Sequence, residues 1–482
     1  MVSPTVTDAE QPSPRSADAT PLPAPEGILR WAPVVAFGLL LLVLSRNVGT
    51  GIADPDTLWH VLAGDHLRDT WQFSGPDPRS SFTSQPWVLT QWLPELALSL
   101  ANQWGGLPAV AFLAQFGRLA VCIAVYFACR RTSGPLAATL VTGITVLATA
   151  ASLSPRPQLV GFALLAVTAS AWVRVLSDQR APWWLVPVTW VWASSHGTWV
   201  VGIMLGLVTT AGLVLDRKVS VRQAVRLALV PVASAGAALL TPLGLGILTA
   251  FGSVRAVSPY IQEWRRPALT DPSTIGLLVL VLLVALGWAR RHSLVSWGAG
   301  GILVVGVGWG LTYSRTVAVG AIIIAPLAAK ALDAVLGRAR PARGREPIVV
   351  AGLVLTVTMI CGLLAATGPE QPVSVPDGTT AALQALPAGS VVYNDDSLGG
   401  WVMWTFPTLR QTADTRAELY GPAQARTYLR VMGAEPGWQA GFDQHQPVAA
   451  LVRADVPLAT ALQRERGWTV AARDDGFLLL RP

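Results

Sequence analysis

Charged residues are scarce in this sequence of 482 residues. Asp, Glu, Lys and Arg make up 13% of it, whereas an average soluble domain has roughly 25%. Hydrophobic residues make up 52% of the chain, and its mean hydropathy is +0.48. This composition excludes an ordinary soluble enzyme and indicates a multi-pass protein of the cell membrane.

Cysteine is almost absent, and its spacing is unsuited to a disulfide. Of three cysteines, Cys122 and Cys129 lie on one predicted helix, about 10.5 Å apart by helical rise, which is too far to bridge. The sequence therefore supports neither a disulfide framework nor a cysteine metal site. It also lacks a glycine-rich nucleotide-binding loop. The net charge of +7 comes from dispersed basic residues rather than a patch, so we expect no nucleic-acid partner.

Long apolar runs dominate the chain after a proline-rich start. Residues 1–30 carry six prolines among Ser, Thr and Ala, which predicts a disordered tail. A membrane core of ~30 Å needs roughly 20 apolar residues per helix. Runs of suitable length lie at about 31–47, 107–129, 135–153, 159–176, 182–195, 198–215, 227–249, 274–289, 293–311, 316–334 and 347–367. We predict a mainly α fold, a transmembrane bundle of about eleven helices over residues 31–367.

Positive charge sets the predicted orientation of this bundle. With the N-terminus in the cytoplasm, the inner loops hold thirteen Lys and Arg residues, and the outer loops up to residue 367 hold only seven. Loops rich in Lys and Arg tend to stay in the cytoplasm. We therefore expect a cytoplasmic N-terminus and an extracytoplasmic C-terminus.

This orientation places five polar segments on the outer face. They are 54–69, 154–158 (SPRPQ), 194–197 (SSHG), 260–267 (YIQEWRRP) and 312–315 (TYSR). Charged groups near membrane depth are costly and tend to mark functional cavities. We therefore expect these segments, scattered through about 260 residues of sequence, to meet in one outward-facing site.

The first outer loop, about 48–106, is long and rich in tryptophan. Its tryptophans are Trp59, Trp71, Trp87, Trp92 and Trp104, and this residue is favoured at the membrane interface. We expect one or two helices between about 57 and 101 that lie in the outer leaflet. Most of the tryptophans would then form an interfacial belt.

Residues 368–482 have a different character. Their charge density rises, and segments such as GSVVYNDDSL and GWTVAARDDGFLLLRP read as strands and short helices with Gly and Asp turns. We expect a small α/β domain outside the membrane. The pairs Asp395-Asp396 and Asp474-Asp475 are interpreted as turn residues, with metal ligation as the alternative.

At this point the residues resemble a known family. A first transmembrane helix followed by Asp54-Pro55-Asp56 and then Trp59-His60 is similar to the GT-C class of membrane glycosyltransferases, which includes protein mannosyltransferases and aminoarabinose transferases. A group of bacterial GT-C-like proteins with a C-terminal extracytoplasmic α/β domain resembles the chain further. The shared features are RPQ at 156–158, HG at 196–197, TPLG at 241–244, EW with a following Pro at 263–267, YNDDSLGGWVMW and DTRAELY. The likeness spans about residues 30–482.

The resemblance implies a transferase that moves a sugar from a polyprenyl-phosphate carrier to a cell-envelope acceptor at the outer face. GT-C enzymes place a carboxylate of the first outer loop beside the acceptor, and the matching residues here are Asp54 and Asp56. A carboxylate within hydrogen-bond reach can take the acceptor proton as general base. We favour Asp56, with His60 one helical turn later available to hold its carboxylate. Protein mannosyltransferases carry adjacent acids, whereas Pro55 separates the acids here, so the division of roles between them stays open.

The leaving lipid phosphate would need fixed cations or a metal ion. The candidate ligands are Arg156, Arg265, Arg266 and Arg315, because a planar guanidinium suits phosphate oxygens, with His196 as a further donor. Asp56 and Glu263 could coordinate a divalent cation, the one cofactor that the sequence suggests. The predicted partners are the lipid bilayer, the polyprenyl-phosphate-linked sugar and the cell-envelope acceptor.

Two other functions stay open. A catalytically inactive GT-C-like scaffold would keep the fold and bind a cell-envelope polymer or partner. A lipid or solute transporter would show paired ionisable residues deep in several helices and internal repeats. Only Arg118 and Arg174 lie well inside apolar runs, and no repeat is visible. Fold membership alone does not decide among these functions.

Overall fold

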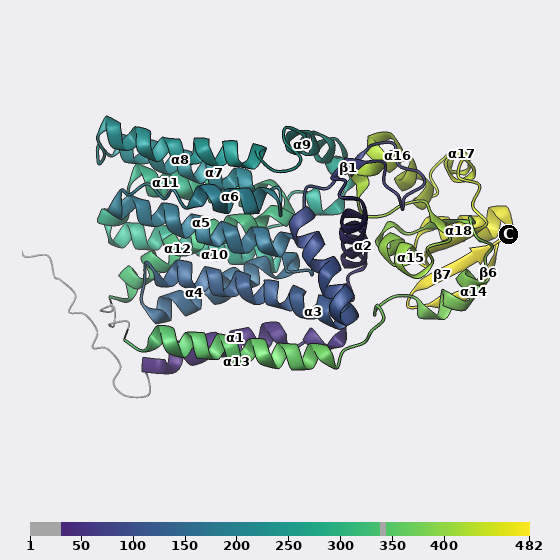
Figure 1. Ribbon diagram of the computed structural model, residues 1–482, viewed down its shortest axis with the longest axis horizontal. Helices are drawn as coiled ribbons and strands as arrows, with labels where there is room; N and C mark the ends of the chain where they lie inside the picture. The colour runs from purple at the N-terminus through teal and green to yellow at the C-terminus, as the bar shows by residue number, and fades with distance from the viewer. Residues whose placement is uncertain (1–29, 338–343) are drawn as a thin grey trace, which may run out of the picture.

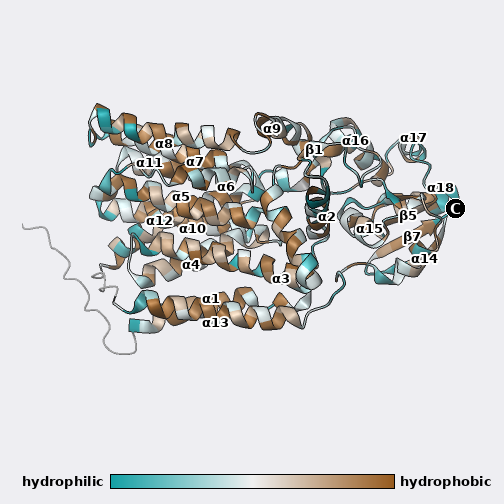
Figure 2. Ribbon diagram, viewed as in Figure 1, coloured by the Kyte–Doolittle hydropathy of each residue, from teal (hydrophilic) through white to brown (hydrophobic). Residues whose placement is uncertain are grey.

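The computed structural model describes residues 30–337 and 344–482, so the predicted disordered tail falls almost entirely outside the described residues. Figure 1 shows a bundle of long helices that run along the longest axis, with the C-terminal domain at one end. The short helix α2 lies across that end, between the bundle and the C-terminal domain (Figure 1). Figure 2 shows hydrophobic residues along the bundle helices and hydrophilic ones at its ends.

The helices up to the C-terminal domain fall into long and short ones. Seven of those in the described residues are long and apolar enough to cross a membrane. The helices are α1 Ala32–Ser45, α2 Pro55–Thr70, α3 Trp92–Arg130, α4 Pro135–Thr149, α5 Gln158–Asp178, α6 Leu185–Ala193, α7 Trp199–Leu215, α8 Val221–Leu239, α9 Gly246–Val257, α10 Pro272–Arg290, α11 Trp297–Thr312, α12 Val317–Leu336 and α13 Glu346–Ala366. The mainly α, polytopic fold class is thus confirmed.

The number of long helices differs from the eleven predicted. Helix α6 has only nine residues. Helices α7 and α11 are apolar but have fewer than the 18 residues of a candidate span, whereas α1 and α4 reach that length because short turns extend them to Ala32–Thr50 and Pro135–Ser152. The predicted run 227–249 is divided between α8 and α9, because the chain turns at residues 240–245. Pro242 has no backbone N–H to continue the helix, and Gly244 takes a positive φ of 53° there. Helix α9 then packs against α16 of the C-terminal domain.

Close contacts between small residues hold the centre of the bundle. Helix α12 packs against α10, α11, α4 and α5. A Cβ atom added at Gly320 would lie 2.4 Å from the carbonyl oxygen of Gly306 and 2.7 Å from the Cα of Gly310. Glycines at such crossings let helix backbones approach closely, which is how membrane helices gain packing contacts without a hydrophobic driving force. Helix α12 begins directly after the short 3-10 helix Ser314–Thr316, which contains Arg315. The position of α12 therefore also fixes the position of the Arg315 guanidinium.

The segment predicted as the first outer loop, about 48–106, folds onto one end of the bundle. It contains α2, the strands β1 (Ser74–Gly75) and β2 (Trp87–Val88), and the first part of α3, which bends at Gly105 and at Gly106 (φ 61°). The interfacial role predicted for most tryptophans is wrong for Trp59 and Trp92, which are each 7% exposed. They are buried because the loop packs its aromatic rings against one another, with Trp59 against Trp87 and Trp92 against Phe73.

The C-terminal domain contains a mixed five-stranded sheet and is called the sheet domain from here on. Its strand order is β4-β3-β5-β7-β6, with β3 parallel to β4 and β5, and β7 antiparallel to β5 and β6. Its elements are α14 Thr380–Gln384, β3 Val391–Asn394, α15 Gly399–Thr405, β4 Arg410–Gln411, α16 Ala417–Met432, α17 Trp438–Asp443, β5 Ala449–Arg453, α18 Pro457–Arg466, β6 Thr469–Asp474 and β7 Phe477–Arg481. This architecture confirms the predicted α/β fold.

One face of the sheet domain docks on α2. Val392 and Tyr393, successive residues of β3, belong to two different hydrophobic clusters, because neighbouring side chains of a strand point to opposite faces. The cluster around Val392 also contains Leu58 of α2. At this contact a Cβ atom on Gly400 would lie 2.1 Å from the carbonyl oxygen of Pro55. The start of α2, with both predicted catalytic acids, is therefore clamped between the bundle and the sheet domain.

Candidate active site

Asp54 and Asp56 stand at the start of α2. Asp54 is the N-cap residue, and its Oδ1 accepts a hydrogen bond of 3.0 Å from the backbone N–H of Asp56. Pro55 occupies the first turn, where a missing N–H costs nothing, and an acidic residue there is favoured by the helix dipole. The local sequence D-P-D therefore fixes both carboxylates at the same helix end.

Arg156 joins the two acids. This residue precedes α5, and its Nε and Nη2 donate to Asp54 over 2.8 and 3.2 Å, while Nη2 lies 2.9 Å from Oδ2 of Asp56. Its Nη1 lies 3.8 Å from Glu263. Burial alone would lower the pKa of Arg156, but the carboxylates of Asp56 and Asp54 outweigh it and raise that pKa. The guanidinium thus stays charged and is already engaged by carboxylates.

The other oxygen of Asp56 is bound by the sheet domain. The hydroxyl of Thr415, between β4 and α16, donates to Oδ1 of Asp56 over 2.6 Å, and the indole N–H of Trp59 donates to Thr415 over 3.3 Å. The side chain of Asp56 is only 6% exposed. Burial raises the pKa of Asp56 to about 6, although Arg156 and the Thr415 hydrogen bond act in the opposite direction.

The neighbouring residue Arg416 fastens the sheet domain to the first outer loop. It donates to both oxygens of Asp414 over 3.0 and 2.8 Å, and it forms a further ion pair with Asp77. Its guanidinium also lies over the rings of Trp59 and Trp87, at 5.1 and 5.0 Å from their centroids. Burial would raise the pKa of Asp414, but Arg416 outweighs that effect and holds the pKa below its ordinary value.

Arg315 provides a second cation in the site. Its Nη1 lies 3.4 Å from Oε2 of Glu263, its Nη2 donates to Gln158 over 3.4 Å, and its guanidinium lies 5.4 Å from the ring centroid of Trp264. Glu263 is half exposed and bridges Arg156 and Arg315. Four of the five polar segments that were predicted to converge thus meet in one network, and 194–197 contributes no residue to it.

Two solved structures have the same architecture. One is the archaeal oligosaccharyltransferase AglB from Archaeoglobus fulgidus, in complex with an inhibitory peptide and a dolichol-phosphate. It matches with a TM-score of 0.54 and 12% sequence identity, and the match covers 89% of this chain and 70% of that chain. The other is ArnT from Cupriavidus metallidurans in the apo state. It matches with a TM-score of 0.53 and 14% sequence identity, and the match covers 93% of this chain and 97% of that chain. Both are GT-C membrane glycosyltransferases. This chain has a GT-C fold. No protein-family model matches it, and no curated protein matches its sequence.

The two histidines predicted for the site are held by other partners. The expectation that His60 holds Asp56 is wrong, because its Nδ1 pairs instead with Glu95 over 2.8 Å in a fully buried contact with α3. Nδ1 of His196 lies 2.9 Å from the Thr198 hydroxyl. Burial lowers the pKa of His60 well below its ordinary value, and burial together with Arg315 lowers the pKa of His196 to about 3. Both rings are therefore uncharged at neutral pH.

Arg265 and Arg266 lie apart from the network. Both side chains are exposed, and neither forms an ion pair with another residue in the described part of the chain. Only the backbone carbonyl of Arg265 is engaged, by the N–H and hydroxyl of Ser314 over 2.9 and 3.0 Å. The structure therefore does not bring these two predicted side chains into the network of Asp54, Asp56, Arg156, Glu263 and Arg315.

The acids do not fit a divalent-cation site. No group of three or more His, Cys, Asp or Glu side chains in residues 30–337 and 344–482 could hold a metal ion. Asp56 and Glu263, the two predicted ligands, both face the guanidinium of Arg156, which takes the place of a cation. Asp395 accepts hydrogen bonds from the N–H and hydroxyl of Ser397, and Asp475 takes a positive φ of 45° between β6 and β7, as turn residues do. Asp474 ends β6 and accepts a hydrogen bond from the distant Gly378.

Proposed function

We propose that this protein is a glycosyltransferase that takes a sugar from a polyprenyl-phosphate carrier and transfers it to a hydroxyl group of a cell-envelope acceptor. The observation that carries the proposal is the network of Asp54, Asp56, Arg156, Glu263 and Arg315 at one end of a GT-C bundle. The AglB structure, which contains a dolichol-phosphate, supports a lipid-phosphate donor.

Asp56 is the proposed general base. With a pKa raised to about 6 by burial, it is mostly ionised at pH 7 and still basic enough to accept a proton. The acceptor hydroxyl gives its proton to Asp56 while its oxygen bonds to the anomeric carbon of the sugar. The bond from that carbon to the phosphate oxygen breaks, and the electron pair leaves with the lipid phosphate.

The two arginines have different proposed roles. Arg156 donates to Asp54 and Asp56 at ordinary hydrogen-bond distances, so it positions the acids. The contacts of Arg315 with Glu263 and Gln158 are longer, both 3.4 Å, so its guanidinium is the better candidate for the leaving phosphate. A charged donor placed where negative charge develops lowers the barrier.

Thr415 controls access to the base. Its hydroxyl, 2.6 Å from Oδ1 of Asp56, occupies the position that an acceptor hydroxyl would need. The acceptor must therefore displace Thr415, which requires a shift of the segment between β4 and α16. The second candidate function is a GT-C scaffold without catalysis. The structure favours it in one respect, because both oxygens of Asp56 are already bound.

Sugar transfer by an Asp56→Asn variant separates these two functions. The substrate is a radiolabelled polyprenyl-phosphate sugar supplied to membranes, with protein level and donor binding measured in parallel. We expect turnover to fall by roughly 10²–10⁴ while donor binding persists. The matched control is Asp65→Asn on the same helix, where the Asp65 carboxylate pairs with Ser99 and Arg68, and it should transfer normally. Near-normal transfer by Asp56→Asn would contradict the general-base role, and absence of transfer in the unmodified protein would favour the scaffold.

A further inference from the structure

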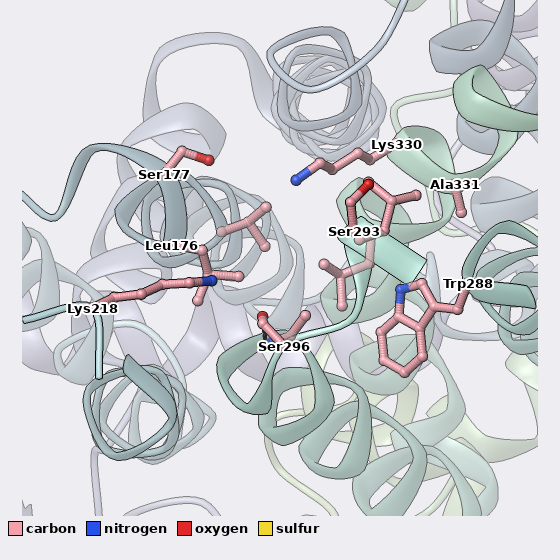
Figure 3. A pocket seen from close by; sticks show the side chains of 12 residues that line it. Leu176, Ser177, Lys218, Trp288, Ser293, Ser296, Lys330 and Ala331 are labelled. Carbon is pink, nitrogen blue, oxygen red and sulfur yellow. Dashed lines mark hydrogen bonds between the residues drawn. The ribbon is translucent and has the colours of Figure 1, made fainter. Parts of the chain in front are cut away.

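A cavity of 60 Å³ lies at the end of the bundle remote from Asp56. Residues of α5, α10, α11 and α12 line it near the helix ends opposite the sheet domain (Figures 1 and 3). One water molecule needs ~10–15 Å³ of cavity volume. The cavity therefore has room for about five water-sized groups, which is about the size of one phosphate group.

Both lysines of the chain line this cavity. The sequence has 35 Lys and Arg residues, and only Lys218 and Lys330 are lysines. They come from distant segments, the turn after α7 and the body of α12, and both side chains border the cavity (Figure 3). Lys carries a compact point charge that binds phosphate without the planar geometry of Arg. In an Arg-rich protein, the use of lysine twice at one cavity indicates a specific need for that ammonium group.

The remaining polar lining can donate hydrogen bonds. It consists of the hydroxyls of Ser177, Ser293 and Ser296 and the indole of Trp288, and no lining residue is acidic. The Ser296 oxygen accepts from Ala299 over 3.1 Å, which leaves its hydroxyl hydrogen available. Trp288 turns its ring nitrogen toward the cavity (Figure 3). A lining of ammonium, hydroxyl and indole N–H groups is complementary to an anion.

Two acids lie close to the cavity without lining it. Asp216 sits 3.6 Å from Lys218, and its Oδ1 accepts the backbone N–H of Trp297. Asp333, one turn beyond Lys330 on α12, accepts the backbone N–H of Gly134. Oδ1 of Asp333 makes that bond, and Oδ2 of Asp216 is the oxygen that faces the Lys218 ammonium. Neither carboxylate lines the cavity, and both moderate its positive charge.

Exposed tryptophans indicate the depth of the cavity in the membrane. Trp183 and Trp184, just before α6, are 47% and 46% exposed, and Trp297, the first residue of α11, is 67% exposed. Tryptophan collects where lipid headgroups meet the hydrocarbon core. The cavity therefore opens at headgroup level, where phosphate is carried by lipids.

We propose that this cavity binds the phosphate headgroup of an anionic phospholipid in the leaflet opposite the Asp56 site. Helix α12 connects the two places, because Arg315 lies two residues before its start at Val317 and Lys330 follows fifteen residues after Arg315, about 22 Å along the helix. The bound headgroup fixes the cavity end of α12 and holds the bundle at a defined depth. The inference does not depend on the proposed transfer reaction.

Lipid binding by the purified full-length protein tests the proposal. The protein in detergent is titrated with dioleoyl phosphatidic acid, and retained lipid is measured by native mass spectrometry. We expect the variant with both Lys218→Ala and Lys330→Ala to bind the lipid at least about tenfold more weakly. The single Lys218→Ala variant, at an exposed position, should show a smaller loss with unchanged thermal unfolding, which guards against misfolding of the double variant.

The matched control removes the same charge elsewhere at this end of the bundle. Arg290 and Arg291 are exposed and do not line the cavity, so the double alanine variant of these two should bind the lipid normally. An equal loss in that control would show nonspecific attraction and overturn the proposal. Inorganic phosphate forms the third arm. Lysine-dependent binding of phosphate that displaces the lipid would identify free phosphate as the ligand and overturn the lipid assignment, whereas phosphate without effect supports it.

Discussion

Thr415→Val should change the pH dependence of sugar transfer. Valine has nearly the shape of threonine but cannot donate the 2.6 Å hydrogen bond to Oδ1 of Asp56. That bond favours the ionised carboxylate, so its loss raises the pKa of Asp56 above about 6. Because the proposed base works in its ionised form, transfer should rise with pH, and the midpoint of that rise should move upward in the variant.

The size of the shift follows from the strength of the bond. A hydrogen bond to a charged group contributes roughly 1.5–3 kcal/mol, and 1.36 kcal/mol corresponds to about one pKa unit. The side chain of Asp56 is only 6% exposed, so solvent screening reduces this little. The midpoint should therefore move by about one to two units, from about 6 in the unmodified protein.

The assay is the initial rate of transfer in membranes between pH 5 and 9 at saturating donor, with the concentration of acceptor varied at each pH. Thr415→Ser keeps the hydroxyl and is the matched control, whose midpoint should stay near that of the unmodified protein. An unchanged midpoint in Thr415→Val, with the rate lowered equally at every pH, would show that Asp56 does not titrate in the reaction. A midpoint that moves downward would contradict the direction of the hydrogen-bond effect.

Three further predictions concern cations and topology. Arg315→Lys should lower turnover and leave thermal stability unchanged, because lysine keeps the charge but loses the forked geometry. Arg156→Lys should also change the midpoint of the pH dependence of transfer. Normal transfer by both variants would assign these residues to structure alone. Arg416→Ala should destabilise the docked sheet domain by about 3–5 kcal/mol, since Asp414 and Asp77 would be left buried and unpaired; thermal unfolding of the purified protein measures this, and a loss below about 1 kcal/mol would contradict it. A reporter fused after Pro482 should be active only outside the cytoplasm, and activity inside would refute the predicted orientation.

The convergence of the polar segments could be predicted from the sequence because membrane topology is simple. Each crossing reverses the side of the membrane, so alternate loops must share a face, and charge bias selects which face. Asp54, Arg156, Glu263 and Arg315 lie in such loops, and the structure places them in one ion-pair network. The fold class could also be predicted from the sequence, because a long apolar run that crosses a membrane has few alternatives to a helix.

The contacts made by the sheet domain could not be predicted in this way. Thr415 and Asp56 are 359 residues apart, and no sequence pattern around either residue indicates that they form a hydrogen bond. His60 lies one turn from Asp56 in sequence, yet its ring turns toward Glu95 of α3, because helix spacing alone does not decide between two available partners. The break between α8 and α9 was missed because TPLG at 241–244 is apolar enough to continue the run.

The long separation of Thr415 from Asp56 also sets an order of events during synthesis. At roughly 5–20 residues per second, α2 would emerge about 20–70 s before the segment that binds its carboxylate, because Thr415 follows Asp56 by 359 residues. During that time Asp56 has Arg156 as its first partner, since that residue is made much earlier. A ribosome that stops before residue 415 would therefore leave in the membrane a helical bundle whose Asp56 carboxylate lacks this partner, and completion of the chain is the event that encloses it.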